Sequence, residues 1–125
     1  MSGTINWTIQ GNVSNGSGNL QQQDALPTIQ RSYTQSGEGV WRATVSVTTG
    51  GVTIAPSLTT PGYIMFVNLD PTNFIQLGGY PSSTLDSVCK LMPGDFAIWP
   101  FDTSATIRAK ADTATCLLDV RAWNR

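Results

Sequence analysis

One stretch constrains the fold more than any other: residues 62–79, GYIMFVNLDPTNFIQLGG. Two short apolar runs, 63–67 and 74–77, flank the turn-forming residues 68–73. β-Branched and aromatic runs joined by such residues are typical of a β-hairpin. Pro71 has no N–H and should interrupt the ladder. Asp70 and Asn73 should hold the corner by hydrogen bonds to backbone N–H groups.

The first run of this stretch has apolar residues on both of its faces. Tyr63, Met65 and Val67 alternate with Ile64 and Phe66. A strand with two apolar faces is typical of one covered on both sides.

The same pattern of short strands and turns recurs along the chain. Besides the two runs above, strands are predicted over 4–10, 28–36, 40–48, 52–54, 88–91, 96–99, 106–111 and 115–123. Gly50-Gly51 and Asp112-Thr113 should each close a hairpin, and Gly78-Gly79 should lie in a loop. Residues 92–95, MPGD, fit a type II turn, with Pro and Gly at its central positions.

About nine short strands at this spacing predict a single-domain, all-β, antiparallel β-sandwich over residues 1–125, most like a jelly roll. Residues 11–27 are rich in Gly, Ser, Asn and Gln and offer little to bury. They predict an extended polar loop or arm, which either connects two strands loosely or lies on a neighbouring subunit.

The composition argues against several classes of function. The net charge of −1 argues against nucleic-acid and membrane-surface binding. The chain has no histidine, which removes His-based nucleophile pairs and the commonest transition-metal ligand. With no signal peptide or spanning segment visible, the chain should be made in a cytoplasm, where Cys89 and Cys116 are most simply two buried thiols; a disulfide between them is the alternative.

The remaining polar and aromatic residues suggest no enzyme and no cofactor. The carboxylates considered for a hydrolytic pair are Glu38, Asp70, Asp86, Asp95, Asp102, Asp112 and Asp119, most of which lie in turns where Asp caps the backbone. Trp41 is in phase with core residues, whereas Tyr80 and Trp99 adjoin loops and are candidates for an exposed stacking platform. The basic residues Arg108, Lys110, Arg121 and Arg125, with Asp112 and Asp119 among them, predict a solvated or subunit-facing surface.

Two motifs resemble known families. Residues 91–95, LMPGD, resemble the second conserved turn of cupins, but a cupin metal site needs histidines that this chain lacks. Residues 60–78, TPGYIMFVNLDPTNFIQLG, followed by LMPGDFA at 91–97 and a hairpin over 106–123, resemble small virion structural proteins of tailed phages. The resemblance covers residues 60–123.

The resemblance implies a non-enzymatic capsid decoration (cement) protein, located in the virion, that binds the major capsid protein. It implies a homo-oligomer, expected to be a trimer. The predicted partner contacts are Leu20, Gln21, Gln22, Leu26, Tyr80 and Trp99. The alternative is a receptor- or carbohydrate-binding module of a phage tail, neck or head fibre, with Tyr80 and Trp99 as stacking platforms.

Overall fold

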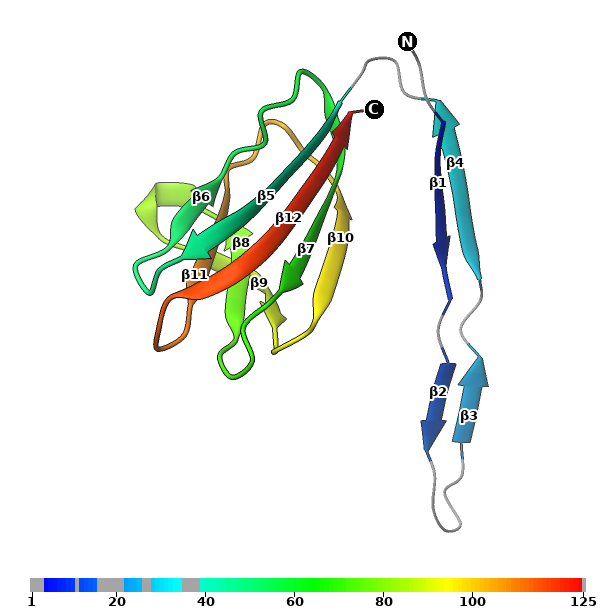
Figure 1. Cartoon of the computed structure of the whole chain (residues 1–125), viewed down its shortest axis with the longest axis horizontal. Helices are drawn as coiled ribbons and strands as arrows, with labels where there is room; N and C mark the ends of the chain where they lie inside the picture. The colour runs from blue at the N-terminus through cyan, green and yellow to red at the C-terminus, as the bar shows by residue number, and fades with distance from the viewer. Residues whose placement is uncertain (1–3, 11, 16–21, 26–27, 35–38, 125) are drawn as a thin grey trace. The chain divides into compact units, whose positions relative to one another are not determined.

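The computed structural model describes residues 4–10, 12–15, 22–25, 28–34 and 39–124 (Figure 1). The chain divides into two compact units, residues 1–36 and 37–125. The described residues form strands and one short 3-10 helix. The all-β class and the antiparallel β-sandwich are therefore confirmed.

The first unit consists of two antiparallel strand pairs. β1 (Thr4–Ile9) pairs with β4 (Ile29–Thr34), and β2 (Asn12–Asn15) pairs with β3 (Gln22–Ala25). The loop or arm predicted over 11–27 thus contains two short strands, and its residues 11, 16–21 and 26–27 lie outside the described residues. Ile9 lies opposite Ile29, and both side chains are about half exposed.

The second unit is a sandwich of two four-stranded antiparallel sheets. Sheet I has the strand order β10 (Phe96–Pro100), β7 (Pro61–Asn68), β12 (Cys116–Asn124) and β5 (Val40–Val47). Sheet II has the order β6 (Val52–Ile54), β11 (Ile107–Ala111), β8 (Ile75–Gly79) and β9 (Asp86–Leu91). Eight strands in this order form the two interlocked Greek keys of a jelly roll.

The three predicted hairpins are wrong in their pairing, although their strands exist. β5 and β6, β7 and β8, and β11 and β12 are consecutive in the chain but lie in different sheets. Each predicted hairpin turn is instead a corner where the chain crosses the sandwich. Among the strands described in the second unit, only β8 and β9 are both consecutive in the chain and paired. A tight turn brings the chain back without fixing whether the returning strand pairs in its own sheet or crosses to the other.

The core lies between the two sheets and follows the alternation of the sequence. Its buried apolar side chains include Ile64 and Phe66 from sheet I and Ile75 and Leu77 from sheet II. Met65 is half-buried on the opposite side of β7. The second side of β7 is therefore only partly covered, less than its sequence predicts.

The corner between β7 and β8 forms with Asp70, but not Asn73, in its predicted role. One carboxylate oxygen of Asp70 accepts hydrogen bonds from the backbone N–H groups of Thr72 at 2.8 Å and Asn73 at 2.6 Å. The Asn73 side chain does not cap the backbone in the predicted way, since its Oδ1 accepts from the Thr113 hydroxyl at 2.9 Å. The predicted type II turn is also present, with a hydrogen bond from Asp95 N to Met92 O at 2.9 Å and a φ of +82° at Gly94.

The corner carboxylates predict how stability responds to acid. Hydrogen bonds from the backbone N–H groups of Asn73 and Thr72 lower the pKa of Asp70 below its ordinary 3.8. Hydrogen bonds from the Ser104 hydroxyl and backbone N–H lower the pKa of Asp102 in the same way. The unfolded chain therefore binds protons more readily than the folded chain does at these two aspartates. Each aspartate contributes to the stability of the fold above pH 3.8, and this contribution is lost as the pH falls through the lower pKa of the folded state.

We therefore expect the free energy of unfolding to fall on acidification below about pH 4. Urea unfolding across acidic pH measures this dependence. Asp70→Asn keeps an oxygen acceptor but cannot titrate, so its stability should vary less with pH than that of the native chain. An unchanged pH dependence in both Asp70→Asn and Asp102→Asn would contradict the assignment.

Gly78 and Gly79 belong to strand β8, which corrects the prediction that they form only a loop. The pairing of β8 with β9 steps from Leu77–Cys89 to Gly78–Ser87, which makes Val88 the extra residue of a β-bulge. A Cβ atom on Gly78 would overlap the carbonyl oxygen of Asp86, the nearest atom to that position. The bulge therefore requires glycine at residue 78.

Both cysteines are free thiols. Cys116 is buried, as predicted, whereas Cys89 is only half-buried. Burial is the main cause that raises the pKa of each thiol above its ordinary 9.0. A raised pKa disfavours the reactive thiolate, so neither residue has the character of a nucleophile.

Candidate partner-binding surface

The outer face of sheet I carries an apolar surface that the core does not use. Strand alternation directs the even-numbered residues of β7 inward and the odd-numbered ones outward. The register carries this alternation across the sheet, so that Phe96 lies beside Val67 and Ile98 beside Met65. By the same register the outer face contains Val40, Tyr63, Met65, Val67, Phe96, Ile98, Leu117 and Trp123.

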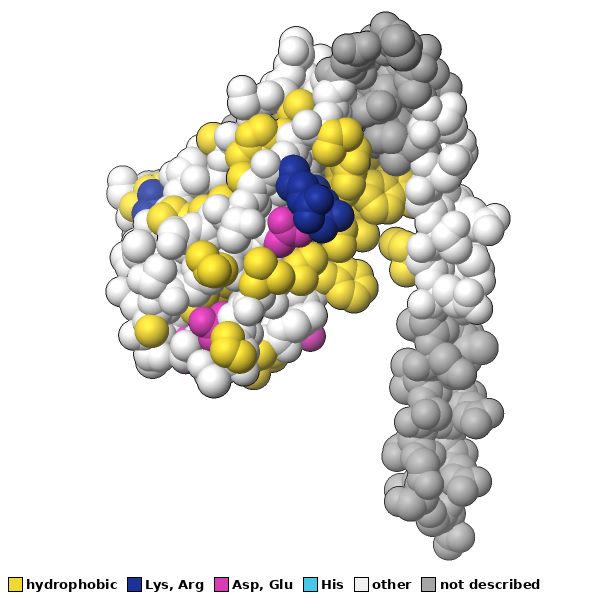
Figure 2. All heavy atoms as spheres, viewed as in Figure 1, with side chains coloured by type: hydrophobic (Ala, Val, Ile, Leu, Met, Phe, Trp, Pro, Cys, Tyr) yellow, Lys and Arg dark blue, Asp and Glu magenta, His cyan; other side chains and the backbone are white. Residues whose placement is uncertain are grey.

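Several of these side chains are well exposed. Val40 is 63% exposed, Phe96 64% and Leu117 50%. Figure 2 shows apolar side chains gathered on this side of the sandwich around a small group of charged residues. A contiguous apolar area of this kind is characteristic of an interaction surface, whereas single exposed apolar residues need no explanation.

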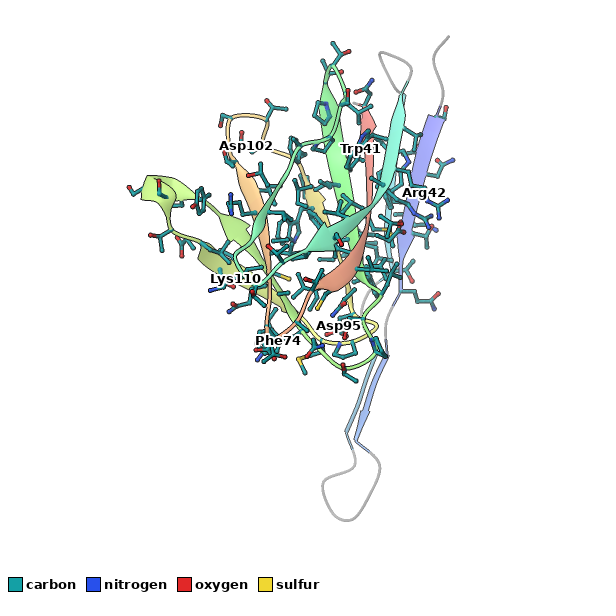
Figure 3. All side chains as sticks on the ribbon, turned by 60° about the vertical axis from the view of Figure 1, so that its left-hand side comes forward. Trp41, Arg42, Phe74, Asp95, Asp102 and Lys110 are labelled. Carbon is teal, nitrogen blue, oxygen red and sulfur yellow. The ribbon has the colours of Figure 1, made fainter. Side chains whose placement is uncertain are left out.

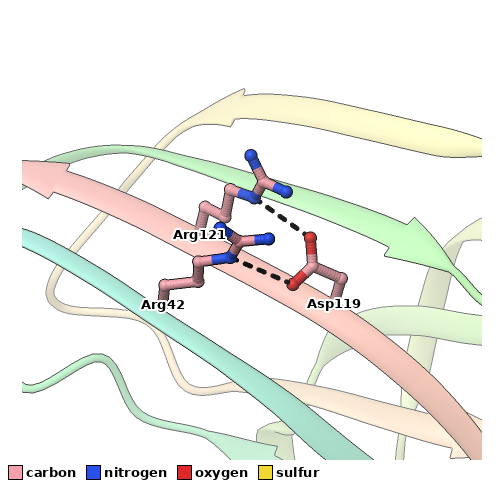
Figure 4. Close-up of polar contacts among 3 residues, drawn as sticks. All are labelled: Arg42, Asp119 and Arg121. Carbon is pink, nitrogen blue, oxygen red and sulfur yellow. Dashed lines mark hydrogen bonds and ion pairs between the residues drawn. The ribbon is translucent and has the colours of Figure 1, made fainter.

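The charged group consists of one aspartate and two arginines (Figure 4). Arg121 Nε donates to Asp119 Oδ2 at 3.0 Å, and Arg42 Nε lies 3.8 Å from Asp119 Oδ1. The register sets Arg42 directly opposite Arg121 on the neighbouring strand. Like charges in that position repel, and the carboxylate of Asp119, which is 8% exposed, neutralises part of that repulsion.

Asp119→Ala should destabilise the fold by about 1–2 kcal/mol, because the two facing arginines lose their shared counter-charge. Urea unfolding at low and high salt measures the effect, which salt should reduce by screening the arginines. The double variant Asp119→Ala/Arg42→Ala should recover part of the loss. No recovery would mean that Asp119 acts by packing and not by charge.

The outer face of sheet II is polar by comparison. Arg108 and Lys110 of β11 point outward, and the Arg108 guanidinium lies 4.1 Å from the centre of the Tyr80 ring. Arg108 also donates to the Thr53 hydroxyl at 3.2 Å. Tyr80, Arg108 and Lys110 line a cavity of about 220 Å³ beside the loop at Ser83–Leu85. Arg108 and Lys110 therefore lie on the opposite sheet from Arg121, and Arg125 lies outside the described residues.

The structure describes three of the predicted contact residues, Gln22, Tyr80 and Trp99. Leu20, Gln21 and Leu26 lie outside the described residues, and Gln22 begins β3 in the first unit. In the sandwich, Tyr80 lies under Arg108, whereas the half-buried Trp99 packs against Phe66 with ring centres 5.2 Å apart. Partner contact by these residues stays a prediction. Trp41 packs against the core from β5, as predicted (Figure 3).

Four of the candidate carboxylates, Asp70, Asp95, Asp102 and Asp119, serve turns or an ion pair, and Glu38 lies outside the described residues. Asp95 accepts from Met92 N at 2.9 Å, and Asp102 accepts from Ser104 N at 2.9 Å. Figure 3 shows these two aspartates at opposite ends of the sandwich. No group of three or more Cys, Asp and Glu residues is placed to hold a metal ion within the described ranges.

The sequence gives only a weak indication of which residues form the exposed apolar surface of sheet I. Leu117 is out of phase with Cys116, Leu118 and Val120, which are buried, so alternation alone directs it outward. Phe96 likewise alternates with Ala97, which packs against the core, so Phe96 points outward. What the sequence does not contain is the register that brings these side chains together from separate strands.

No protein-family model, curated protein or solved structure matches this chain. Within the described ranges, no helix is both long enough and apolar enough to span a membrane.

Proposed function

We propose that this chain is a non-enzymatic structural protein of a tailed-phage virion, which decorates the capsid by binding the major capsid protein. The single observation that carries the binding role is the exposed apolar surface of sheet I around Phe96, Leu117 and Val40. The resemblance of residues 60–123 to small virion proteins supports the location. The low share of charged residues, 12%, suits a rigid surface unit that binds through apolar area.

In this proposal the sandwich supplies the apolar surface, and the first unit supplies an extended arm. In the arm, Ile9 and Ile29 face each other across β1 and β4 with about half of each side chain exposed. Two strands alone are marginally stable in water, so such an arm gains stability when a partner covers its apolar side. The subunits are proposed to act as a homo-oligomer.

Sedimentation of the chain with capsids that lack it tests the proposed surface. Phe96→Asp and Leu117→Asp place charges on the outer face of sheet I and should each reduce the bound fraction at least about tenfold. Val88→Asp is the matched control, since Val88 is 73% exposed but lies on sheet II. Equal binding by all three variants would overturn the assignment of this face.

A second candidate function is a receptor- or carbohydrate-binding module of a phage tail, neck or head fibre. The cavity beside Tyr80 and Arg108 favours it, because an aromatic ring and charged hydrogen-bond donors are what a polar ligand such as a sugar requires. Tyr80→Ala should then abolish binding to a glycan array and leave sedimentation with capsids unchanged. The reverse pattern would favour decoration.

A further inference from the structure

The free edge of strand β5 differs from the other three edges of the sandwich. β5 has eight residues, no proline, and a continuous register with β12. β6 has only three residues. β10 ends in Pro100, which has no N–H to offer, and β9 contains the bulge at Val88. Within the described sandwich, β5 is the one edge that no such feature protects from pairing.

The hydrogen bonds of sheet I show which groups β5 presents at this edge. Asn124 N donates to Gly39 O at 3.1 Å, which makes this a hydrogen-bonded pair in the register of β12 with β5. Such pairs alternate along antiparallel strands, so Trp41, Ala43 and Val45 bond to β12. The N–H and C=O groups of Arg42, Thr44 and Ser46 therefore point away from the sheet.

A second hydrogen bond leads independently to the same assignment of which β5 residues bond to β12. Leu69 N donates to Leu117 O at 3.0 Å, so the odd-numbered residues of β12 bond to β7. Its even-numbered residues must then bond to β5, which agrees with the Asn124–Gly39 pair. The outward groups of β5 thus form a row of alternating donors and acceptors that is a template for pairing with another extended strand.

We propose that two copies of this chain associate through their β5 strands, antiparallel and centred on Thr44, to join two copies of sheet I into one continuous sheet. In this register Thr44 pairs with Thr44 of the second copy, and Arg42 pairs with Ser46. The three central pairs exchange about six backbone hydrogen bonds. This association does not depend on the proposed virion function.

Charge favours this register of the two β5 strands. Centring the pair on Arg42 would set two arginines directly opposite each other, which is unfavourable. Centring it on Thr44 separates them by four residues along the strand, about 13 Å, which exceeds the screening length in physiological salt.

Sedimentation velocity of the full chain tests the association, and we expect a concentration-dependent dimer. Thr44→Pro removes an N–H that no strand of the sandwich uses and should weaken the dimer at least about tenfold. A native chain that stays monomeric at high concentration would overturn the proposal. So would a Thr44→Pro variant that keeps the native unfolding transition and still dimerises as the native chain does.

Cysteine substitution tests the register and does not require Thr44→Pro to fold. Thr44→Cys should form a disulfide-linked dimer under mild oxidation, because Cα atoms of such a pair lie about 5.5 Å apart. Ser46→Cys is the matched control, since in this register its two copies lie about 13 Å apart and should not cross-link. Cross-linking of Ser46→Cys without cross-linking of Thr44→Cys would overturn the register. Failure of the dimer would leave the predicted abundance in phage particles unaffected, so the two proposals fail separately.

Discussion

Gly78→Ala is expected to lower the free energy of unfolding by about 3 kcal/mol or more. The Cβ would overlap the backbone of Asp86, and backbone cannot move aside as the end of a flexible side chain can. The bulge in β9 would have to shift or open. Urea unfolding measures the change through the midpoint at constant slope.

Gly79→Ala is the matched control for this prediction. Gly79 is the next residue of the same strand, but a Cβ there would meet only the Pro81 ring at an ordinary 3.7 Å. Its stability should lie within about 1 kcal/mol of the native value, or rise slightly, because alanine restricts the unfolded chain. Equal losses for the two variants would show that the approach of Gly78 to Asp86 is not what the fold depends on.

Asn68→Ala is expected to cost about 3 kcal/mol of stability. The Asn68 amide is 1% exposed, and its Nδ2 donates to Asn73 O at 2.9 Å and to Leu91 O at 3.0 Å. Its Oδ1 accepts from Asp70 N at 2.9 Å. One side chain thus ties the β7–β8 corner to the end of β9, and truncation leaves three buried or part-buried polar groups without their partner.

Two further variants separate this role from a simple loss of volume. Asn68→Asp keeps the shape and the acceptor but sets a carboxylate oxygen against two carbonyl oxygens, so at neutral pH it should be at least as unstable as Asn68→Ala. Asn73→Ala, which loses only exposed side-chain hydrogen bonds, should cost less than about 1 kcal/mol. A stable Asn68→Asp variant, measured by urea unfolding, would contradict the assigned hydrogen bonds.

The positions of the strands could be predicted from the sequence, whereas their partners could not. The alternation around Trp41 and Val47 gives β5 and its inward face, and MPGD at 92–95 gives a type II turn. The corner at Asp70 also forms as predicted. These features depend on a few neighbouring residues, so a short stretch of sequence determines them.

Pairing depends on contacts between distant parts of the chain. β7 lies between β10 and β12 and does not pair with β8, which follows it. The turn residues at 68–73 are compatible with either arrangement, and only the packing of one sheet on the other selects the crossing. The sheet I surface escapes prediction for the same reason, because Phe96 and Leu117 come together through the order of the strands.

Quantitative mass spectrometry of purified phage particles that carry this gene tests the central claim most directly. The decoration proposal predicts a copy number equal to that of the major capsid protein or to a simple fraction of it. A handful of copies would contradict decoration and place the chain in the tail, neck or a fibre. Absence from the particles would contradict a virion role altogether.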